Sequence, residues 1–320
     1  MAKKMKLNES KRRLITKVAY MYYVEGLTQT DISKKLQIYR TTVGRMLAKA
    51  RKYGIVKISI QGYDTTIFKI EEQLKQKYDL KDAVVIPNKI GQSNDEKDKN
   101  LGKAGFQYLS QIIKPGQTIG VSWGKVLRSM ADQAKGSSSL DTIFVPLVGG
   151  PSAANTEYHV NGIVYDMAKK FGGRNIFIDS AAVQETQYIR DSIMSSNYFR
   201  DIETYWDNLD IALVGIGGPL NGNISRWRDL LTLEDIDLLK DEHAIGDCCC
   251  TFYSREGKIL KGELANRTIA IGLDRLKSVK TTVGIARSFS KVNSIDVLYK
   301  MHILNTLITD EETAQRLLEL

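Results

Sequence analysis

Two short stretches near the start of the chain carry apolar residues at helical spacing. Between residues 14 and 25, apolar side chains recur three or four positions apart, which predicts an amphipathic helix ending at Gly26. Its expected inner face consists of Leu14, Ile15, Val18, Ala19, Tyr22 and Tyr23. A second helix is predicted over residues 28–36, because Thr28 can cap its first amides and Asp31 stands at the capping-box position.

A third helix is predicted over residues 40–53, with Gly54 as its end. Its expected inner face consists of Val43, Met46, Leu47 and Ala50. Alternating apolar and polar residues at 55–60 then predict a short strand. Three short helices followed by a strand indicate an N-terminal all-α winged helix-turn-helix, in which the last helix reads the major groove of DNA.

After about residue 62 the pattern changes to short apolar runs that alternate with helical stretches. The expected strands are 83–86, 118–121, 143–148, 176–178, 211–217, 281–286 and 303–308. The clearest helices are 66–78, 95–113 and 157–171. This alternation predicts a doubly wound α/β domain with a mostly parallel sheet and helices on both faces. In such folds ligands bind outside the carboxyl ends of the strands.

Charge divides the chain in the same place. Residues 1–60 hold fifteen of the 46 Lys and Arg residues and three acids, a formal charge of +12, whereas residues 61–320 sum to −3. A basic patch confined to one small module is typical of polyanion binding, although a solvated helical face is the plainer alternative. We therefore expect a DNA-binding domain over residues 1–60 and a second domain over residues 61–320.

The start of the third predicted helix carries side chains suited to double-stranded DNA. Arg40 and Arg45 can donate bidentate hydrogen bonds to guanine, and Thr41 and Thr42 can contact phosphate or a thymine methyl group. The residues expected to contact DNA are Thr28, Gln29, Tyr39, Arg40, Thr41, Thr42, Arg45 and Lys49.

Composition narrows the remaining possibilities. No run of about 18 apolar residues exists, so no membrane span is expected, and no apolar segment of a secretory signal follows the charged start. The three cysteines are consecutive, Cys248–Cys250, and cannot cross-link distant segments, which favours a reducing cytoplasm. The cysteines are most simply interpreted as small apolar side chains in or beside a strand. A redox or metal role for this run with His243 is the alternative, but no second ligand pair at metal spacing exists. We expect no metal and no cofactor.

Several predicted strands end in residues that suit an anionic ligand. Ser122, Trp123 and Gly124 follow one strand, and a helix opens near Lys125, so that backbone amides, a hydroxyl group and a cation come together. Glycines that allow a backbone to approach a ligand follow two other strands, at Gly149 and Gly150 and at Gly215, Gly217 and Gly218. This pattern favours a sugar-phosphate or nucleotide site. Neither GxGxxG in the first βα unit nor GxxxxGK[ST] occurs, which argues against hydride transfer and nucleotide hydrolysis.

The stretch GLTQTDISKKLQIYRTTVGRMLAKARKYGIVKISI resembles the DNA-binding module of the SorC-type sugar-binding transcriptional regulators. The resemblance continues through GVSWGK, VPLVGG, DIALVGIG, AIGD, REGKI, NRTIAIGLDRLK and LNTLITDEETAQRLL, in that order. It implies a winged helix-turn-helix joined to an effector domain similar in fold to sugar-phosphate isomerases. It also implies a homotetramer, with part of the subunit contact at residues 62–80, that binds operator DNA and a phosphorylated sugar.

The resemblance also implies roles for individual residues of the second domain. The phosphate is expected near Gly120, Ser122, Trp123, Gly124 and Lys125. Asp247 is expected to accept a sugar hydroxyl, and Lys291 to reach a phosphate. The full expected effector site is Gly120, Ser122, Trp123, Gly124, Lys125, Gly149, Gly150, Gly217, Asp247 and Lys291, with Arg226 and Arg228 as looser candidates.

Four positions depart from the family pattern. Tyr39 stands where a serine usually caps the third helix, and tyrosine cannot cap in that way. Arg287 and Ser288 replace two glycines before Lys291, which can add or remove a ligand contact. Val148 stands where some relatives have a lysine that forms a Schiff base, so a covalently bound sugar is not expected.

The leading hypothesis is a regulator of a carbohydrate-catabolic operon whose DNA affinity is controlled by a phosphorylated sugar, and not an enzyme. The alternative is a sugar-phosphate isomerase-like enzyme carrying a basic module, which needs a positioned general base. The available groups are Asp247, Glu263, His159, His243 and His302, and no two of them form a recognisable acid–base motif. A non-specific DNA-coating protein would not need the second domain.

Overall fold

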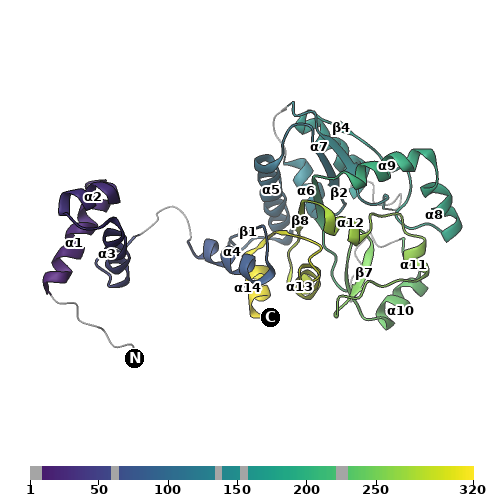
Figure 1. Ribbon diagram of the computed structural model, residues 1–320. Coiled ribbons are helices and arrows are strands. Elements are labelled where there is room, and N and C mark those ends of the chain that lie inside the picture. Colours follow the sequence, from purple (N-terminus) through teal and green to yellow (C-terminus); the bar gives the residue numbers. More distant parts are fainter. Residues whose placement is uncertain (1–8, 59–64, 134–138, 152–157, 221–229) are drawn as a thin grey trace. The chain divides into compact units, whose positions relative to one another are not determined.

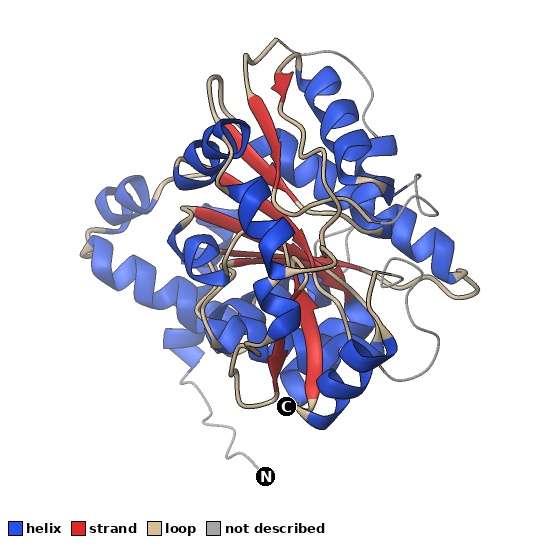
Figure 2. Ribbon diagram, turned by 90° about the vertical axis from the view of Figure 1, so that its right-hand side faces the viewer, coloured by secondary structure: helices blue, strands red, loops and turns tan. Residues whose placement is uncertain are grey.

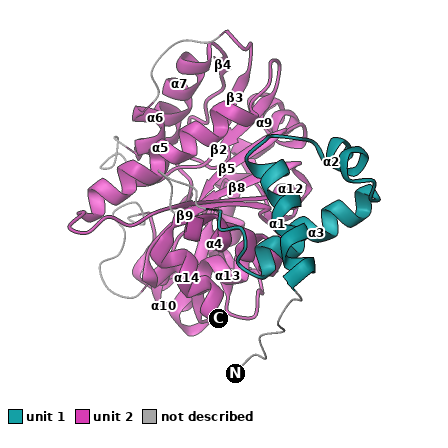
Figure 3. Cartoon of the chain, turned by 90° about the vertical axis from the view of Figure 1, so that its left-hand side faces the viewer, with its two compact units in different colours: residues 1–63 teal, residues 64–320 magenta. Residues whose placement is uncertain are grey.

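The computed structural model describes residues 9–58, 65–133, 139–151, 158–220 and 230–320. The chain divides into two compact units, Met1–Tyr63 and Asp64–Leu320 (Figure 3).

The first unit contains helices α1 (Glu9–Tyr23), α2 (Gln29–Leu36) and α3 (Arg40–Lys52) (Figure 1). The predicted capping box is confirmed: Thr28 Oγ1 accepts from the Asp31 amide at 3.2 Å, and Asp31 Oδ2 accepts from the Thr28 amide at 3.3 Å. The core of this unit is Ile15, Val18, Ala19, Met21, Ile32, Val43, Leu47 and Ala50. Three predicted helices therefore share one small core.

Two details of the first unit differ from prediction. Helix α1 begins at Glu9, and it buries Met21 while Tyr22 and Tyr23 are exposed. Residues 55–58 do not form the predicted strand, and residues 59 and 60 lie outside the described residues. The amides of Ile55 and Val56 both donate to the Ala50 carbonyl oxygen, as in a helix end with a left-handed glycine at Gly54. These two amides are thus used by the helix end and not by a strand.

The second unit is built on a seven-stranded sheet with the order β1-β9-β8-β5-β2-β3-β4, in which every described pairing is parallel. The strands are β1 Asp82–Ile86, β2 Thr118–Val121, β3 Ile143–Pro146, β4 Arg174–Asn175, β5 Ile211–Gly215, β8 Thr281–Ile285 and β9 Thr306–Asp310. Helices surround the strands (Figure 2). Strands β2 and β5 are neighbours in the sheet. The chain continues from β2 to β3 and β4 on one side of this pair, and from β5 to β8 and β9 on the other side, so the strand order reverses between β2 and β5.

The helices of this unit are α4 Thr65–Tyr78, α5 Asn94–Ile112, α6 Lys125–Asp132, α7 Val160–Phe171, α8 Gln187–Met194, α9 Asn197–Asp207, α10 Leu233–Asp241, α11 Glu263–Asn266, α12 Leu273–Ser278, α13 Val292–Lys300 and α14 Glu311–Glu319. The predicted helices at 66–78, 95–113 and 157–171 correspond to α4, α5 and α7. Helix α4 is fixed to the far end of the chain, because Tyr78 donates to Asp296 of α13 at 2.8 Å and Lys77 donates to the Leu317 carbonyl oxygen at 2.7 Å.

Several strand predictions differ from the structure. The strands predicted at 143–148 and 211–217 end two residues early, at Pro146 and Gly215. Residues 176–178 are not a strand, since the edge strand β4 ends at Asn175. The last strand begins at Thr306 and not at residue 303. A separate antiparallel hairpin, β6 (Ala244–Cys248) and β7 (Thr251–Ser254), was not predicted.

Candidate functional site

A cavity of about 690 Å³ lies at the carboxyl ends of β2, β5 and β8. It therefore opens at the point where strand order reverses, which is where doubly wound sheets bind ligands. The wall includes seven of the residues expected from the sequence: Ser122, Trp123, Gly124, Lys125, Gly217, Asp247 and Lys291.

The segment after β2 is fixed to the end of β5. Ser122 is buried, and its Oγ accepts from the Gly215 amide at 3.0 Å. Gly124 has φ +135, which side chains rarely adopt, and it precedes the first turn of α6 without a side-chain cap. The first amides of α6 therefore face the cavity region with the positive end of the helix dipole, an arrangement that favours anions.

Lys125 and Arg287 both form ion pairs with the start of α5. Lys125 Nζ lies 2.5 Å from Asp95 and 3.4 Å from Asp98, and Arg287 Nε donates to Asp98 at 2.6 Å. Arg287 also donates to the carbonyl oxygen of Asn94 at 2.7 Å. Hydrogen bonding to Asp95 raises the pKa of Lys125, and the same bond lowers the pKa of Asp95.

The sequence reasoning missed this acidic side of the cavity. The described wall holds three cations, Lys125, Arg287 and Lys291, and three carboxylates, Asp95, Asp98 and Asp247, so its formal charge is zero. A signal existed, because Ser93 and Glu96 form a capping box that starts α5 soon after β1, at the edge of the sheet where ligands bind.

Asp247 reaches the cavity from the unpredicted hairpin. Its carbonyl oxygen accepts from the Gly217 amide at 2.8 Å, and the Gly217 carbonyl oxygen accepts from Ser294 Oγ at 2.6 Å. Tyr253 of β7 completes this buried network, with its hydroxyl 2.7 Å from Ser294 Oγ. The loop after β5, the hairpin and α13 are thereby held together beside the cavity.

The cysteine run forms the tip of this hairpin. Cys249 and Cys250 are the two turn residues, with φ +50 and +57, as in the type I′ turns that usually contain Asn and Gly. Both line the cavity. Hydrogen bonding to Cys248 and burial raise the pKa of Cys249, so this thiol stays protonated near neutral pH. No group of three or more His, Cys, Asp or Glu side chains that could hold a metal occurs among the described residues.

The two replaced glycines lie in the cavity wall. Ser288 keeps φ +114, a value that glycine adopts readily and serine does not, and its amide donates to Thr313 Oγ1 at 3.0 Å. Lys291 ends the following 3-10 turn, Phe289–Lys291, directly before α13. The chain has thus kept the backbone shape of glycine at residue 288 and placed a cation at residue 287.

Three expected effector residues do not line the cavity. A side chain at Gly120 would meet Leu147 at 2.3 Å, one at Gly149 would meet the Ala181 carbonyl oxygen at 2.6 Å, and one at Gly150 would meet His159 at 2.4 Å. These glycines permit close packing inside the unit. Arg226 and Arg228 lie outside the described residues.

The groups considered for proton transfer are also dispersed. Of that set, Asp247 lines the cavity, whereas Glu263, His159, His243 and His302 do not. Only one of the five groups considered for proton transfer therefore lies in the described cavity wall.

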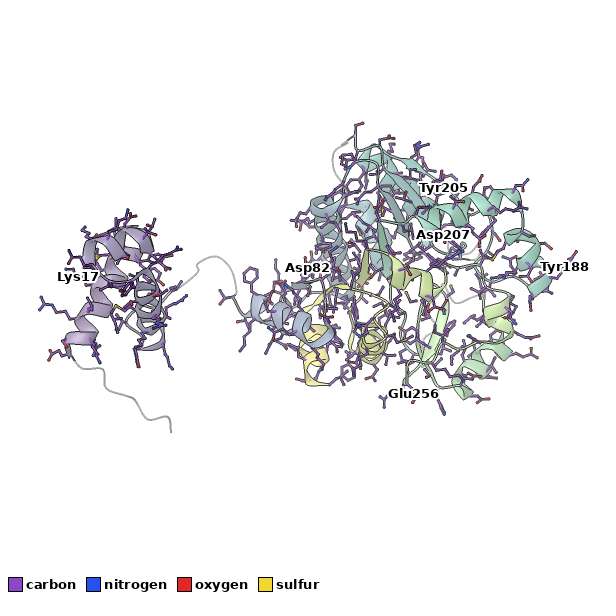
Figure 4. The ribbon with its side chains drawn as sticks, in the orientation of Figure 1. Lys17, Asp82, Tyr188, Tyr205, Asp207 and Glu256 are labelled. Carbon is purple, nitrogen blue, oxygen red and sulfur yellow. The ribbon has the colours of Figure 1, made fainter. Side chains whose placement is uncertain are left out.

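In the first unit, the residues expected to contact DNA lie mostly at the surface. Thr28, Arg40, Thr41, Arg45 and Lys49 are exposed, and Gln29 and Thr42 are partly exposed. Tyr39 precedes α3 without a side-chain cap bond and is 84% exposed. Lys17 of α1 adds a further exposed cation (Figure 4).

Comparison with known proteins places the chain in a family. Residues 65–319 match the family model Sugar-bind, described as "Putative sugar-binding domain". The Sorbitol operon regulator of Klebsiella pneumoniae is 36% identical over 315 residues, which cover 98% of this chain and 99% of that protein. The chain belongs to the SorC family of sugar-binding transcriptional regulators.

Other members of the SorC family agree with this assignment. The Deoxyribonucleoside regulator of Bacillus subtilis is 25% identical and covers 97% of this chain and 99% of its own length. The crystal structure of the full-length SorC regulator from Klebsiella pneumoniae superimposes with a TM-score of 0.76 at 36% identity, covering 97% of this chain and 100% of that one. A transcriptional regulator from Streptococcus pneumoniae gives 0.75 at 36% identity, covering 80% and 98%.

SorC family membership decides between the two functional classes. The relatives are transcriptional regulators, which confirms the prediction of a regulator and not an enzyme. Among the described residues, no helix has the length and apolar character needed to cross a membrane.

Proposed function

We propose that the chain is a DNA-binding transcriptional regulator of a carbohydrate-catabolic operon, acting in the cytoplasm, whose affinity for operator DNA is controlled by a phosphorylated sugar. The observation that carries the proposal is the similarity to the Sorbitol operon regulator, which extends over 98% of the chain and so includes both units. The sugar-binding family match covers the second unit, and the first unit remains as the reader of DNA.

The phosphate is proposed to bind at the start of α6, between Lys125 and Lys291. The amides after Gly124, which have no side-chain cap, and the presence of two cations in the wall of one cavity support this placement. The buried Asp247 can accept hydrogen bonds from sugar hydroxyls, because an ionised carboxylate acts as an acceptor. The proposed effector contacts are Ser122, Trp123, Gly124, Lys125, Gly217, Asp247 and Lys291.

The first unit is proposed to be a helix-turn-helix with α3 in the major groove, without the predicted strand at residues 55–58. Support comes from the exposure of basic residues on α3 beside a fully formed three-helix core. The proposed DNA contacts are Thr28, Gln29, Tyr39, Arg40, Thr41, Thr42, Arg45 and Lys49.

Control of DNA affinity is proposed to act through a homotetramer, in which α4 supplies part of the subunit contact. Phe68 of α4 is 48% exposed and offers an apolar contact. Coupling between effector and DNA is reciprocal, so operator DNA changes the affinity for the sugar by the same factor as the sugar changes the affinity for DNA. Analytical ultracentrifugation of the purified chain measures the oligomeric state.

A thermal-shift screen tests the effector. Phosphorylated sugars are compared with their unphosphorylated forms, because a ligand that binds only the folded state raises the unfolding temperature. The phosphorylated form alone is expected to stabilise the protein, and Lys125→Ala is expected to remove the effect, while Lys240→Ala on the exposed face of α10 keeps it. If unphosphorylated sugars raise the unfolding temperature of the protein, and still do so in Lys125→Ala, the site does not recognise a phosphate group.

A binding assay tests the DNA reader. DNA fragments selected from a random pool are titrated with wild type, Arg45→Ala and Lys17→Ala, two variants that each lose one exposed cation. Arg45→Ala is expected to weaken binding by about 1–3 kcal/mol and to relax the selected sequence, whereas Lys17→Ala weakens all sequences alike. If both variants weaken DNA binding equally and keep the same selected sequence, the assignment of α3 to the major groove is wrong.

A further inference from the structure

Two of the three cations in the described cavity wall, Lys125 and Arg287, are already paired with carboxylates of the protein itself. Asp98 bridges them, lying 3.4 Å from Lys125 and 2.6 Å from Arg287, and Asp95 lies 2.5 Å from Lys125. An anion that enters the cavity must therefore compete with these two carboxylates for the same ammonium and guanidinium groups.

The first two turns of α5 carry the two carboxylates. Ser93 and Glu96 form a reciprocal capping box, and Arg287 binds the Asn94 carbonyl oxygen in addition to Asp98. Lys97 forms a further ion pair with Glu312 of α14 at 3.5 Å. The competitors for the cations are thus part of an ordered helix start and not of a loose surface chain.

The two carboxylates differ in how strongly they compete. The Asp95 side chain is 72% exposed and the Asp98 side chain is 13% exposed. Water screens the first much more than the second, so repulsion of an incoming anion by Asp98 is the larger effect. Removing the charge of Asp98 should consequently change anion affinity more than removing the charge of Asp95.

We propose that Asp95 and Asp98 are specificity-determining residues, which keep Lys125 and Arg287 in ion pairs so that a free inorganic anion does not occupy the cavity. This inference rests on the proposed function, because it concerns the same effector site. A phosphorylated sugar differs from a bare phosphate in carrying several hydroxyl groups. Those hydroxyls donate to the carboxylates, which accept hydrogen bonds in their ionised form, and so offset the repulsion that excludes phosphate.

Inorganic phosphate is the probe for this selection. Calorimetric titration of the full chain is carried out for wild type, Asp95→Asn, Asp98→Asn and the matched control Asp237→Asn, which loses the same charge from the exposed face of α10. One unit charge at about 4 Å changes binding about fivefold in a water-like medium and more near a protein surface. We expect phosphate to bind about fivefold tighter to Asp95→Asn, more than tenfold tighter to Asp98→Asn, and unchanged to Asp237→Asn.

Lys125→Met separates failure of this inference from failure of the proposed function. If Lys125→Met weakens phosphate binding while both Asn variants stay within twofold of wild type, the carboxylates do not select and the inference is overturned, although the phosphate site stands. If Asp95→Asn and Asp98→Asn gain no phosphate binding and Lys125→Met changes nothing, both fail together. Because Asp95 is exposed, Asp95→Asn folds normally and keeps the test valid even if Asp98→Asn is destabilised.

Discussion

Replacement of Ser294 by alanine tests the buried network that holds Asp247 at the cavity. Ser294 is fully buried; its Oγ donates to the Gly217 carbonyl oxygen at 2.6 Å and lies 2.7 Å from the Tyr253 hydroxyl. Since the serine proton goes to Gly217, the tyrosine hydroxyl donates to Ser294 Oγ. Alanine removes both partners at once.

The size of the effect follows from the groups left without a partner. The Tyr253 hydroxyl can turn to the Ser294 carbonyl oxygen, 3.2 Å away, but the Gly217 carbonyl oxygen loses its serine donor. The space left by the hydroxyl is small, because Gly246 packs so closely that a Cβ built there would lie 2.0 Å from Ser294 Oγ and 2.5 Å from the Gly217 carbonyl oxygen. One buried unsatisfied group costs about 1–3 kcal/mol, and we expect about 2 kcal/mol. For a unit of this size that lowers the unfolding temperature by about 4–8 °C.

Intrinsic tryptophan fluorescence measures this unfolding selectively. All three tryptophans, Trp123, Trp206 and Trp227, lie in the second unit, so the signal reports on that unit alone. The control Ser110→Ala removes a hydroxyl from the exposed face of α5 and is expected to change stability by less than about 0.5 kcal/mol. If Ser294→Ala melts as late as Ser110→Ala, the network does not stabilise the unit and the reasoning is wrong.

Three further predictions concern caps and a buried ion pair. Thr28→Ala removes the cap of α2 and is expected to cost about 1 kcal/mol, seen as faster hydrogen exchange of residues 28–36. Tyr39→Ser supplies the missing cap of α3 and is expected to slow exchange there, by about 1 kcal/mol. Asp235 forms a buried ion pair with Arg267; burial raises its pKa, but hydrogen bonds from Arg267 and Thr232 outweigh burial and lower it. Its contribution to stability is therefore complete above about pH 4 and lost as pH falls further, and Arg267→Met is expected to cost about 3–5 kcal/mol in chemical denaturation.

Each of these predictions has a contrary outcome. Unchanged exchange in Thr28→Ala would mean that the capping box does not stabilise α2, and faster exchange in Tyr39→Ser would mean that the tyrosine packs usefully. For the ion pair, Asp235→Asn should flatten the loss of stability on the acid side of pH 4, as followed by denaturation at several pH values. The same acid slope in Asp235→Asn and wild type would assign it to other carboxylates.

Local chemistry made much of the fold predictable. The Thr28–Asp31 capping box and the glycine at the end of α3 act over a few residues, so their sequence signals are complete in themselves. The alternation of apolar runs with helical stretches is likewise visible within short windows of sequence, and it indicated the parallel sheet. The cavity residues after β2, from Ser122 to Lys125, follow from the rule that ligands bind at the carboxyl ends of strands.

The parts that were missed depend on which distant segments meet. Asp95 and Asp98 enter the cavity because α5 lies beside α6 and β8, and strand order is not written in the local pattern. Gly120, Gly149 and Gly150 resemble ligand-binding glycines in sequence, but their neighbours Leu147, Ala181 and His159 leave no room for a side chain. The same residue type serves both purposes, so the choice between them requires the packing.

The hydrogen bond from Tyr78 to Asp296 has a consequence for the path between the two units. Burial and the neighbouring carboxylate raise the pKa of Tyr78, so its proton is retained and the bond persists at every physiological pH. Helix α4 is where the chain enters the second unit, and α13 begins directly after Lys291 in the cavity wall. One helix, α13, therefore adjoins the cavity wall at its start and also holds α4, the first helix of the second unit, through the bond from Tyr78 to Asp296.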